Sequence, residues 1–183
     1  MLNPINYTDA SAGYILPNLF LSLLAIDFKS LELVPVLAES RPKIEKLDGG
    51  KLMITYTIRK EAVWDNGTPV TAKDVEFSIK VIKNPKVNNP QNKPYYDFIE
   101  DFISYSDNPK KFTLLCKETY ILAEASSGDY GVLPEYVYDP KGLMKEFTVL
   151  QLNQNKDALT DNEKINEFAT DFNSEKRQRE KDF

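Results

Sequence analysis

The sequence contains no histidine and only one cysteine among its 183 residues. Without histidine, the chain lacks the most common general base of enzymes and the most common metal-binding side chain. Catalytic sites of the Ser-His-Asp or Cys-His type are therefore excluded, and so are zinc sites built from cysteine and histidine. Cys116 cannot form a disulfide within the chain, and we expect it to be a small buried side chain of the apolar stretch 112–116.

Long apolar runs and clustered basic residues are missing as well. The longest apolar run, near Leu19 to Ile26, is interrupted by Ser22 and is shorter than a membrane-spanning helix requires. The N-terminus does not resemble a signal peptide, so we expect a protein that is either cytoplasmic or separated from its targeting segment. The net charge is −5, and no basic stripe precedes the C-terminal tail, which argues against nucleic-acid binding.

Aromatic residues and alternating patterns are abundant instead. Ten tyrosines and ten phenylalanines provide large apolar groups for the core of one domain. Alternation of apolar and polar residues predicts two β-hairpins, the first from 43–47 and 51–60 around an Asp-Gly-Gly turn. The second combines 99–105 with 111–117. In the second arm of the first hairpin, the even-numbered residues form the apolar face.

Helical spacing of apolar residues predicts two helices ahead of the second hairpin. The first covers residues 11–25, and an extended edge segment, 33–37, follows it. The second helix follows the turn Trp64–Pro69, which contains the turn-forming pair Asn-Gly. Thr71 and Asp74 have the spacing of a capping box at its start, and we expect it to end near Asn84. A short helix is also expected within 120–127.

The composition changes near the C-terminus. The last 31 residues contain six basic and eight acidic side chains, with Ile165, Phe168 and Phe172 as a thin helical stripe. This pattern predicts a solvated terminal helix that runs into a frayed tail. We therefore divide the chain into a domain, residues 1–152, and a charged helical C-terminal extension, residues 153–183. The order of hairpin, helix and hairpin predicts an α+β fold, with an antiparallel sheet and helices on one face.

Carboxylates are the only remaining candidates for chemistry. Asp97, Glu100 and Asp101 are close enough in sequence to form a paired-carboxylate hydrolase site or a hard-cation site. Charged residues at junctions between helices and loops are usually solvated, however. We therefore assign the chain no catalytic residue, no metal ligand and no cofactor.

One stretch, residues 57–78, resembles the signature of a known family. It runs from a strand ending in Ile58-Arg59 to the motif W-D-N-G-T-P-V-T-A-K-D-V at 64–75. In the peptide- and nickel-type (family 5) extracellular solute-binding proteins of ABC importers, the strand ends in L-R and the motif reads W-S-D-G-x-P-V-T-A-x-D-V. Asp65-Asn66 therefore replace Ser-Asp, and Ile58 replaces leucine. Four further stretches resemble family motifs in the same order: Leu2–Pro4, Leu19–Leu24, Pro35–Ser40 and Val132–Tyr138.

The resemblance implies an α+β subdomain of the type II periplasmic binding protein architecture. In such proteins two lobes close around a ligand, and this subdomain supplies part of the cleft wall. Tyr95 resembles the tyrosine of a Pro-Tyr pair whose ring faces the cleft in several peptide binders; the alternative is an aromatic side chain that packs at the start of a short helix. The signature residues to which we assign structural roles are Arg59, Trp64, Gly67, Thr71 and Asp74.

The functional expectation also comes from the resemblance. The family's G-(T/S)-G-P-Y motif, the long region after it and the export signal are absent, so we expect a fragment of a longer protein. That protein would be non-catalytic, periplasmic or lipid-anchored, and would deliver oligopeptides to an ABC permease. The alternative is an interaction or regulatory domain on the same scaffold, without a role in transport. A hydrolase that uses Asp97 or Asp101 is a third hypothesis.

Overall fold

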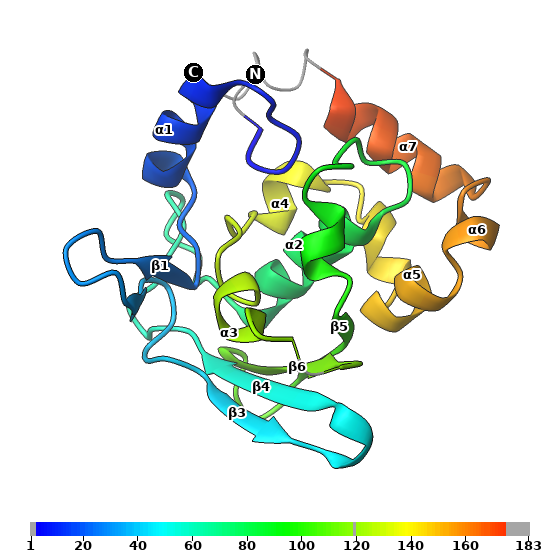
Figure 1. Ribbon diagram of the computed structural model, residues 1–183. Coiled ribbons are helices and arrows are strands. Elements are labelled where there is room, and N and C mark those ends of the chain that lie inside the picture. Colours follow the sequence, from blue (N-terminus) through cyan, green and yellow to red (C-terminus); the bar gives the residue numbers. More distant parts are fainter. Residues whose placement is uncertain (1–2, 119, 175–183) are drawn as a thin grey trace.

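The computed structural model describes residues 3–118 and 120–174 and contains two antiparallel sheets. Figure 1 shows the larger sheet at the bottom of the view, with the helices on one side of it. The predicted α+β fold, with an antiparallel sheet and helices on one face, is confirmed. Within the described ranges, no helix is long and apolar enough to cross a membrane.

The smaller sheet pairs β1 with β2, and the larger has the order β3-β4-β6-β5. The strands are β1 (Leu24–Ile26), β2 (Leu33–Pro35), β3 (Lys43–Lys46), β4 (Leu52–Thr57), β5 (Ile99–Ser104) and β6 (Lys111–Cys116). The helices are α1 (Ala10–Leu19), α2 (Ala72–Lys83), α3 (Ala123–Ser126), α4 (Glu135–Tyr138), α5 (Val149–Gln154), α6 (Lys156–Leu159) and α7 (Glu163–Asn173). Short 3₁₀ turns cover Asp48–Gly50, Lys93–Tyr96 and Leu143–Glu146.

Both predicted hairpins are present, and they join through the β4–β6 pair. Tyr56 of β4 lies opposite Phe112 of β6, so the apolar faces of the two hairpins form one continuous surface. The ring of Phe112 stacks between those of Tyr56 and Phe102, at centroid distances of 5.5 and 5.1 Å. This surface is buried because α2 and α5 pack on the same side of the sheet.

Helix α2 begins at the predicted capping box. The Asp74 carboxylate accepts hydrogen bonds from the backbone N–H of Thr71, at 2.8 Å, and from its hydroxyl, at 3.1 Å. The helix ends at Lys83 with Asn84 as its C-cap, close to the predicted end, because Pro85 cannot continue it. Val75, Ile79 and Ile82 form its buried stripe, and Phe77 and Val81 are also buried, so α2 is a central helix with neighbours on several sides.

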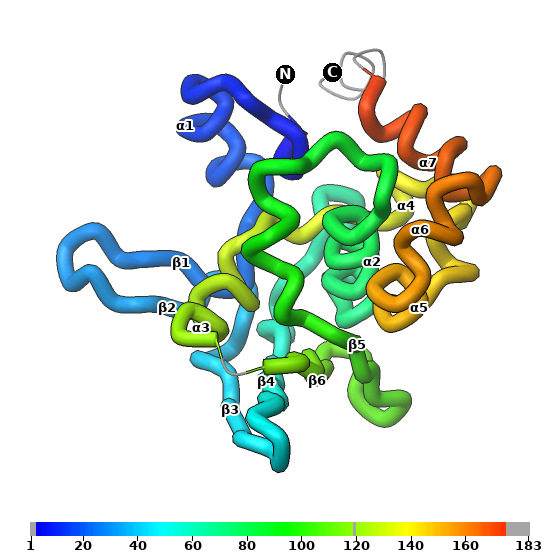
Figure 2. The backbone as a smooth tube through the Cα atoms, turned by 45° about the vertical axis from the view of Figure 1, so that its right-hand side comes forward, coloured from blue at the N-terminus to red at the C-terminus, as the bar shows by residue number. Residues whose placement is uncertain are grey.

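The first predicted helix is shorter than expected. It ends at Leu19, Pro17 lies inside it, and the chain turns extended at Phe20. The expectation of a helix as far as residue 25 is wrong because Leu24 belongs to β1. Its backbone N–H donates to the carbonyl of Gly128, and β1 pairs with the predicted edge segment. Figure 2 shows β1 and β2 as an arm that projects from the rest of the fold.

The C-terminal helix also differs from the prediction. Ile165, Phe168 and Phe172 of α7 are buried, so the expectation of a solvated helix is wrong for 163–173. Phe168 stacks on Phe172 and meets the ring of Phe77 edge-on, with centroid distances of 5.5 and 6.0 Å. The division of the chain after residue 152 stays a prediction, and α5 runs across it. The rest of the predicted tail, 175–183, lies outside the described residues.

Candidate functional site

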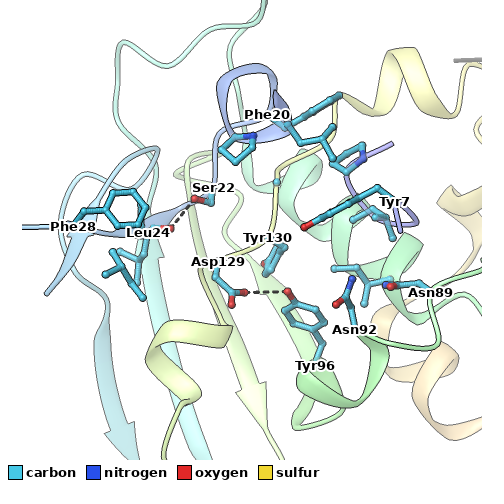
Figure 3. Close-up of a pocket in the computed structure, with 18 residues that line it drawn as sticks. Tyr7, Phe20, Ser22, Leu24, Phe28, Asn89, Asn92, Tyr96, Asp129 and Tyr130 are labelled. Atoms are coloured by element: carbon cyan, nitrogen blue, oxygen red, sulfur yellow. Dashed lines mark hydrogen bonds between the residues drawn. The ribbon is translucent and has the colours of Figure 1, made fainter. Parts of the chain in front are cut away.

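A cavity of about 560 Å³ lies between the N-terminal segment, β1 and the loop that follows α2. Figure 3 shows its walls, with Tyr96 and Asn92 on the side of that loop. Aromatic and aliphatic side chains form most of its surface, and a few polar groups lie among them. Such a composition is typical of small-molecule sites. The lining residues are Pro4, Ile5, Tyr7, Leu16, Pro17, Phe20, Ser22, Leu24, Ala25, Ile26, Phe28, Ile82, Asn89, Asn92, Tyr96, Asp129, Tyr130 and Gly131.

Two of the polar groups are joined by a hydrogen bond. The Tyr96 hydroxyl donates to Oδ1 of Asp129 at 3.0 Å (Figure 3). Asp129 is exposed at the surface of the cavity. Partial loss of hydration raises the pKa of its carboxyl, and the hydrogen bond from Tyr96 lowers it by a smaller amount. Burial and the neighbouring Asp129 charge raise the pKa of the Tyr96 hydroxyl well above its ordinary value. A further hydrogen-bond donor would therefore stabilise the charged form of the Asp129 carboxylate.

Tyr130 supplies a polar group with an unused hydrogen-bonding capacity. Its side chain is only 4% exposed, and its ring packs edge-on against Tyr96 at a centroid distance of 5.6 Å. The hydroxyl is buried without a hydrogen-bond partner in the part of the chain that the structure describes. Leaving a hydroxyl unpaired costs about 1–3 kcal/mol. A ligand group that reached this oxygen would recover part of that free energy.

The cavity suits non-covalent binding of a polar, uncharged backbone. The Asp129 carboxylate accepts hydrogen bonds, the Tyr130 hydroxyl donates or accepts, and the amides of Asn89 and Asn92 do both. Peptide groups carry donors and acceptors of these kinds.

The predicted ligand contact lies one residue from this wall. Tyr95 is 56% exposed and is not a lining residue, whereas Tyr96, next to it in the 3₁₀ turn, is one. A ligand contact by Tyr95 stays a prediction. Tyr95 thus lies in the same 3₁₀ turn as the cavity-lining Tyr96. Nothing in the sequence pattern indicated Asp129 and Tyr130.

The signature residues surround the turn between β4 and α2, away from the cavity. Arg59 donates from Nε to the carbonyl of Ala38 and from Nη2 to that of Pro35, both at 3.1 Å. These bonds tie the segment after β2 to the end of β4. Gly67 has a φ of 81° in the Asn-Gly turn, a conformation that favours glycine. The partly buried Trp64 packs against the hydrophobic core.

The three acidic residues considered for chemistry do not share a site. Asp97 pairs with Lys156 at 3.0 Å, and Glu100 pairs with Lys51 at 2.7 Å. Asp101 accepts a hydrogen bond from the backbone N–H of Phe102. Across 3–118 and 120–174, no group of histidine, cysteine and acidic residues is arranged to hold a metal ion.

The expectation of a buried cysteine is confirmed. Cys116 ends β6 on the core side of the sheet and is fully buried. Burial raises the pKa of its thiol to about 12, so the thiol stays protonated at neutral pH. A protonated, inaccessible thiol is a poor nucleophile, which agrees with the interpretation of Cys116 as a small apolar side chain.

The fold and the sequence signature together point to one family of proteins. The chain belongs to the bacterial extracellular solute-binding proteins, family 5, because the sequence model of that family's middle region matches residues 32–164. The resemblance carried by the tryptophan motif is therefore confirmed. A comparison with curated proteins found no match.

Several solved structures share the fold. The oligopeptide-binding protein of Thermus thermophilus, complexed with a pentapeptide, is 21% identical with a TM-score of 0.63, covering 97% of this chain and 30% of that protein. AppA of Bacillus subtilis, in complex with a nonapeptide, is 21% identical with a TM-score of 0.61, covering 84% and 28%. NikZ of Campylobacter jejuni, in complex with Ni(L-His), is 23% identical with a TM-score of 0.56, covering 84% and 28%. The chain thus spans less than a third of the length of these proteins.

Proposed function

We propose that this chain is part of a non-catalytic, extracytoplasmic solute-binding protein that captures short peptides for an ABC importer. The cavity bounded by Tyr96, Asp129 and Tyr130 would form one wall of the peptide site. The observation that carries this proposal is the Tyr96–Asp129 hydrogen bond on the cavity wall, with the buried, unpaired Tyr130 hydroxyl beside it. Family membership and the peptide complexes among the structural neighbours support it.

The exposed apolar side chains of α1 and the β1–β2 arm support a larger assembly. Tyr14, Phe28 and Leu31 are 83%, 94% and 76% exposed, and their burial would stabilise a contact with another protein surface. We propose that the remaining lobes of the solute-binding protein cover this face, and that an ABC permease recognises the closed, liganded form. The protein would act in the periplasm or on the cell surface, held there by a lipid anchor.

The alternative is an interaction domain that uses this apolar face for a different partner and binds no peptide. The two functions differ in what the cavity does. Peptide binding requires that a ligand contact Tyr130 and its neighbours, whereas an interaction domain would leave the cavity unused. Chemical-shift mapping of the isotope-labelled chain distinguishes them, because it locates even a weak contact.

We expect an alanine tetrapeptide at millimolar concentration to shift the amide signals of residues around the cavity, including 129–131. The affinity would be weak, because one wall alone supplies only part of the contacts that offset the entropy of binding. Tyr130→Phe should reduce the shifts, and Tyr95→Phe serves as the matched control. Absent or scattered shifts would contradict the peptide site. Loss of the shifts in Tyr95→Phe alone would move the contact to the residue predicted from sequence.

A further inference from the structure

A second cavity, of about 230 Å³, lies at the C-terminal end of α2, and its lining is strongly basic. Three lysines and one aspartate contribute to it, together with two apolar residues. The lining residues are Ile82, Lys83, Pro85, Lys93, Asp97 and Lys156. Charges of one sign that are held close together in a partly desolvated cavity repel each other, so they favour a counter-ion.

Lys83 is the most buried of the three lysines. It is 4% exposed, and its Nζ donates to the carbonyl of Tyr96 at 3.0 Å and to Oδ1 of Asn153 at 2.8 Å. An ammonium group has three donors, so one remains. Within residues 3–118 and 120–174, no carboxylate lies within 4 Å of this nitrogen. Among the described residues, only neutral oxygens therefore accept hydrogen bonds from the Lys83 ammonium.

The other two lysines contribute unequally to the local charge. Lys93 donates to the carbonyls of Asn84 and Val87, both at 2.8 Å. It thereby covers carbonyl oxygens beyond the last turn of α2 that would otherwise repel an anion. Lys156, the first residue of α6, pairs with Asp97 at 3.0 Å. One carboxylate thus faces three ammonium groups, and no other described lining residue carries a negative charge that would offset the excess positive charge.

We propose that this cavity binds a small inorganic oxyanion of the phosphate or sulfate class between Lys83, Lys93 and Lys156. Its volume is sufficient, because a water molecule occupies about 30 Å³ of the liquid and a tetrahedral oxyanion only a few times that volume. The anion accepts hydrogen bonds from the remaining N–H groups of Lys83 and Lys93. Such charge-assisted hydrogen bonds are about twice as strong as neutral ones. It also joins three segments: the end of α2, the loop after it and the start of α6.

Binding should be linked to the protonation of Lys83. Burial lowers the pKa of this ammonium to about 7; the charges of Lys156 and Lys117 act in the same direction, while Asp97 and Cys116 oppose them. Burial also lowers the pKa of Lys93, helped by Lys156 and opposed by Asp97. An anion stabilises the charged form, so it binds more tightly as the pH falls through about 7 and Lys83 becomes protonated.

Calorimetric titration of the 183-residue chain with sodium sulfate tests this site, because the charge of sulfate is constant near neutral pH. Sodium chloride keeps the ionic strength equal throughout. We expect saturable binding that is weakened by about tenfold or more in Lys83→Met. Lys29→Met is the matched control, because it removes the same charge from an exposed position of the β1–β2 arm and should leave the affinity unchanged. Inorganic phosphate should compete with sulfate.

The fold of Lys83→Met is checked by circular dichroism, and Lys156→Gln provides a second variant at a more exposed position. Three results would overturn the proposal. They are the absence of saturable sulfate binding, equal affinity in wild type and Lys83→Met, and an affinity that does not rise between pH about 8 and about 6. The peptide titration described above is independent, since its cavity shares neither Lys83 nor Lys156.

Discussion

Replacing Phe168 by alanine tests whether α7 is part of the core. The Phe168 side chain is 1% exposed and packs between Phe77 of α2 and Phe172 of its own helix. Removing a buried phenylalanine ring typically costs about 3–5 kcal/mol, since the lost transfer free energy adds to that of the cavity left behind. Domains of this size are stable by only about 5–15 kcal/mol. We therefore expect Phe168→Ala to lose a large part of the total stability.

Urea denaturation followed by circular dichroism measures the effect. With a slope of roughly 2 kcal/mol/M, the midpoint should fall by about 1.5–2.5 M. Phe28→Ala is the control, because Phe28 is 94% exposed and its removal should change the free energy of unfolding by less than about 0.5 kcal/mol. If Phe168→Ala shifted the midpoint no more than Phe28→Ala, α7 would not be docked on α2, and the solvated helix predicted from sequence would be right.

Three further predictions concern local features. Gly67→Ala should cost about 1 kcal/mol or more, because φ is 81° there, whereas Gly13→Ala inside α1 should be neutral or stabilising; thermal unfolding of both variants compares them. Tyr130→Phe should leave the free energy of unfolding unchanged or raise it, since it removes an unpaired buried hydroxyl, and a loss above about 1 kcal/mol would reveal a partner. Because the folded pKa of Lys83 is about 7, the unfolded chain binds more protons above that pH, and stability should rise with pH from about 7 towards the ordinary lysine pKa. Lys83→Met should flatten that rise, and urea midpoints measured across this range would refute the linkage if both chains behaved alike.

Local signals account for most of what could be predicted. The Asn-Gly pair required a turn whichever residues packed around it, and Thr71 with Asp74 formed a capping box within four residues of chain. The hairpins followed from alternation because one face of the sheet is buried and the other is not. These features depend on neighbours in sequence, so the pattern alone was enough to predict them.

The errors concern contacts between distant segments. The thin stripe on α7 does not reveal whether a partner covers it, and that partner, Phe77, lies on another helix. Similarly, the end of α1 was set by strand pairing rather than by helical spacing. At the candidate site, successive residues of a 3₁₀ turn point about a third of a turn apart. Tyr96 therefore lies on the cavity wall and Tyr95 does not, while a ligand contact by Tyr95 stays a prediction.

The position of α7 also bears on how the chain folds during synthesis. The ring of Phe77 is buried against Phe168, so the last apolar layer of the core cannot form until the residues of α7 have been translated. The chain is synthesised at about 5–20 residues per second, and an incomplete domain exposes apolar surface during that time. The β-hairpins and α2 are synthesised before α7. Until α7 is in place, one side of α2 therefore leaves apolar surface exposed to other chains.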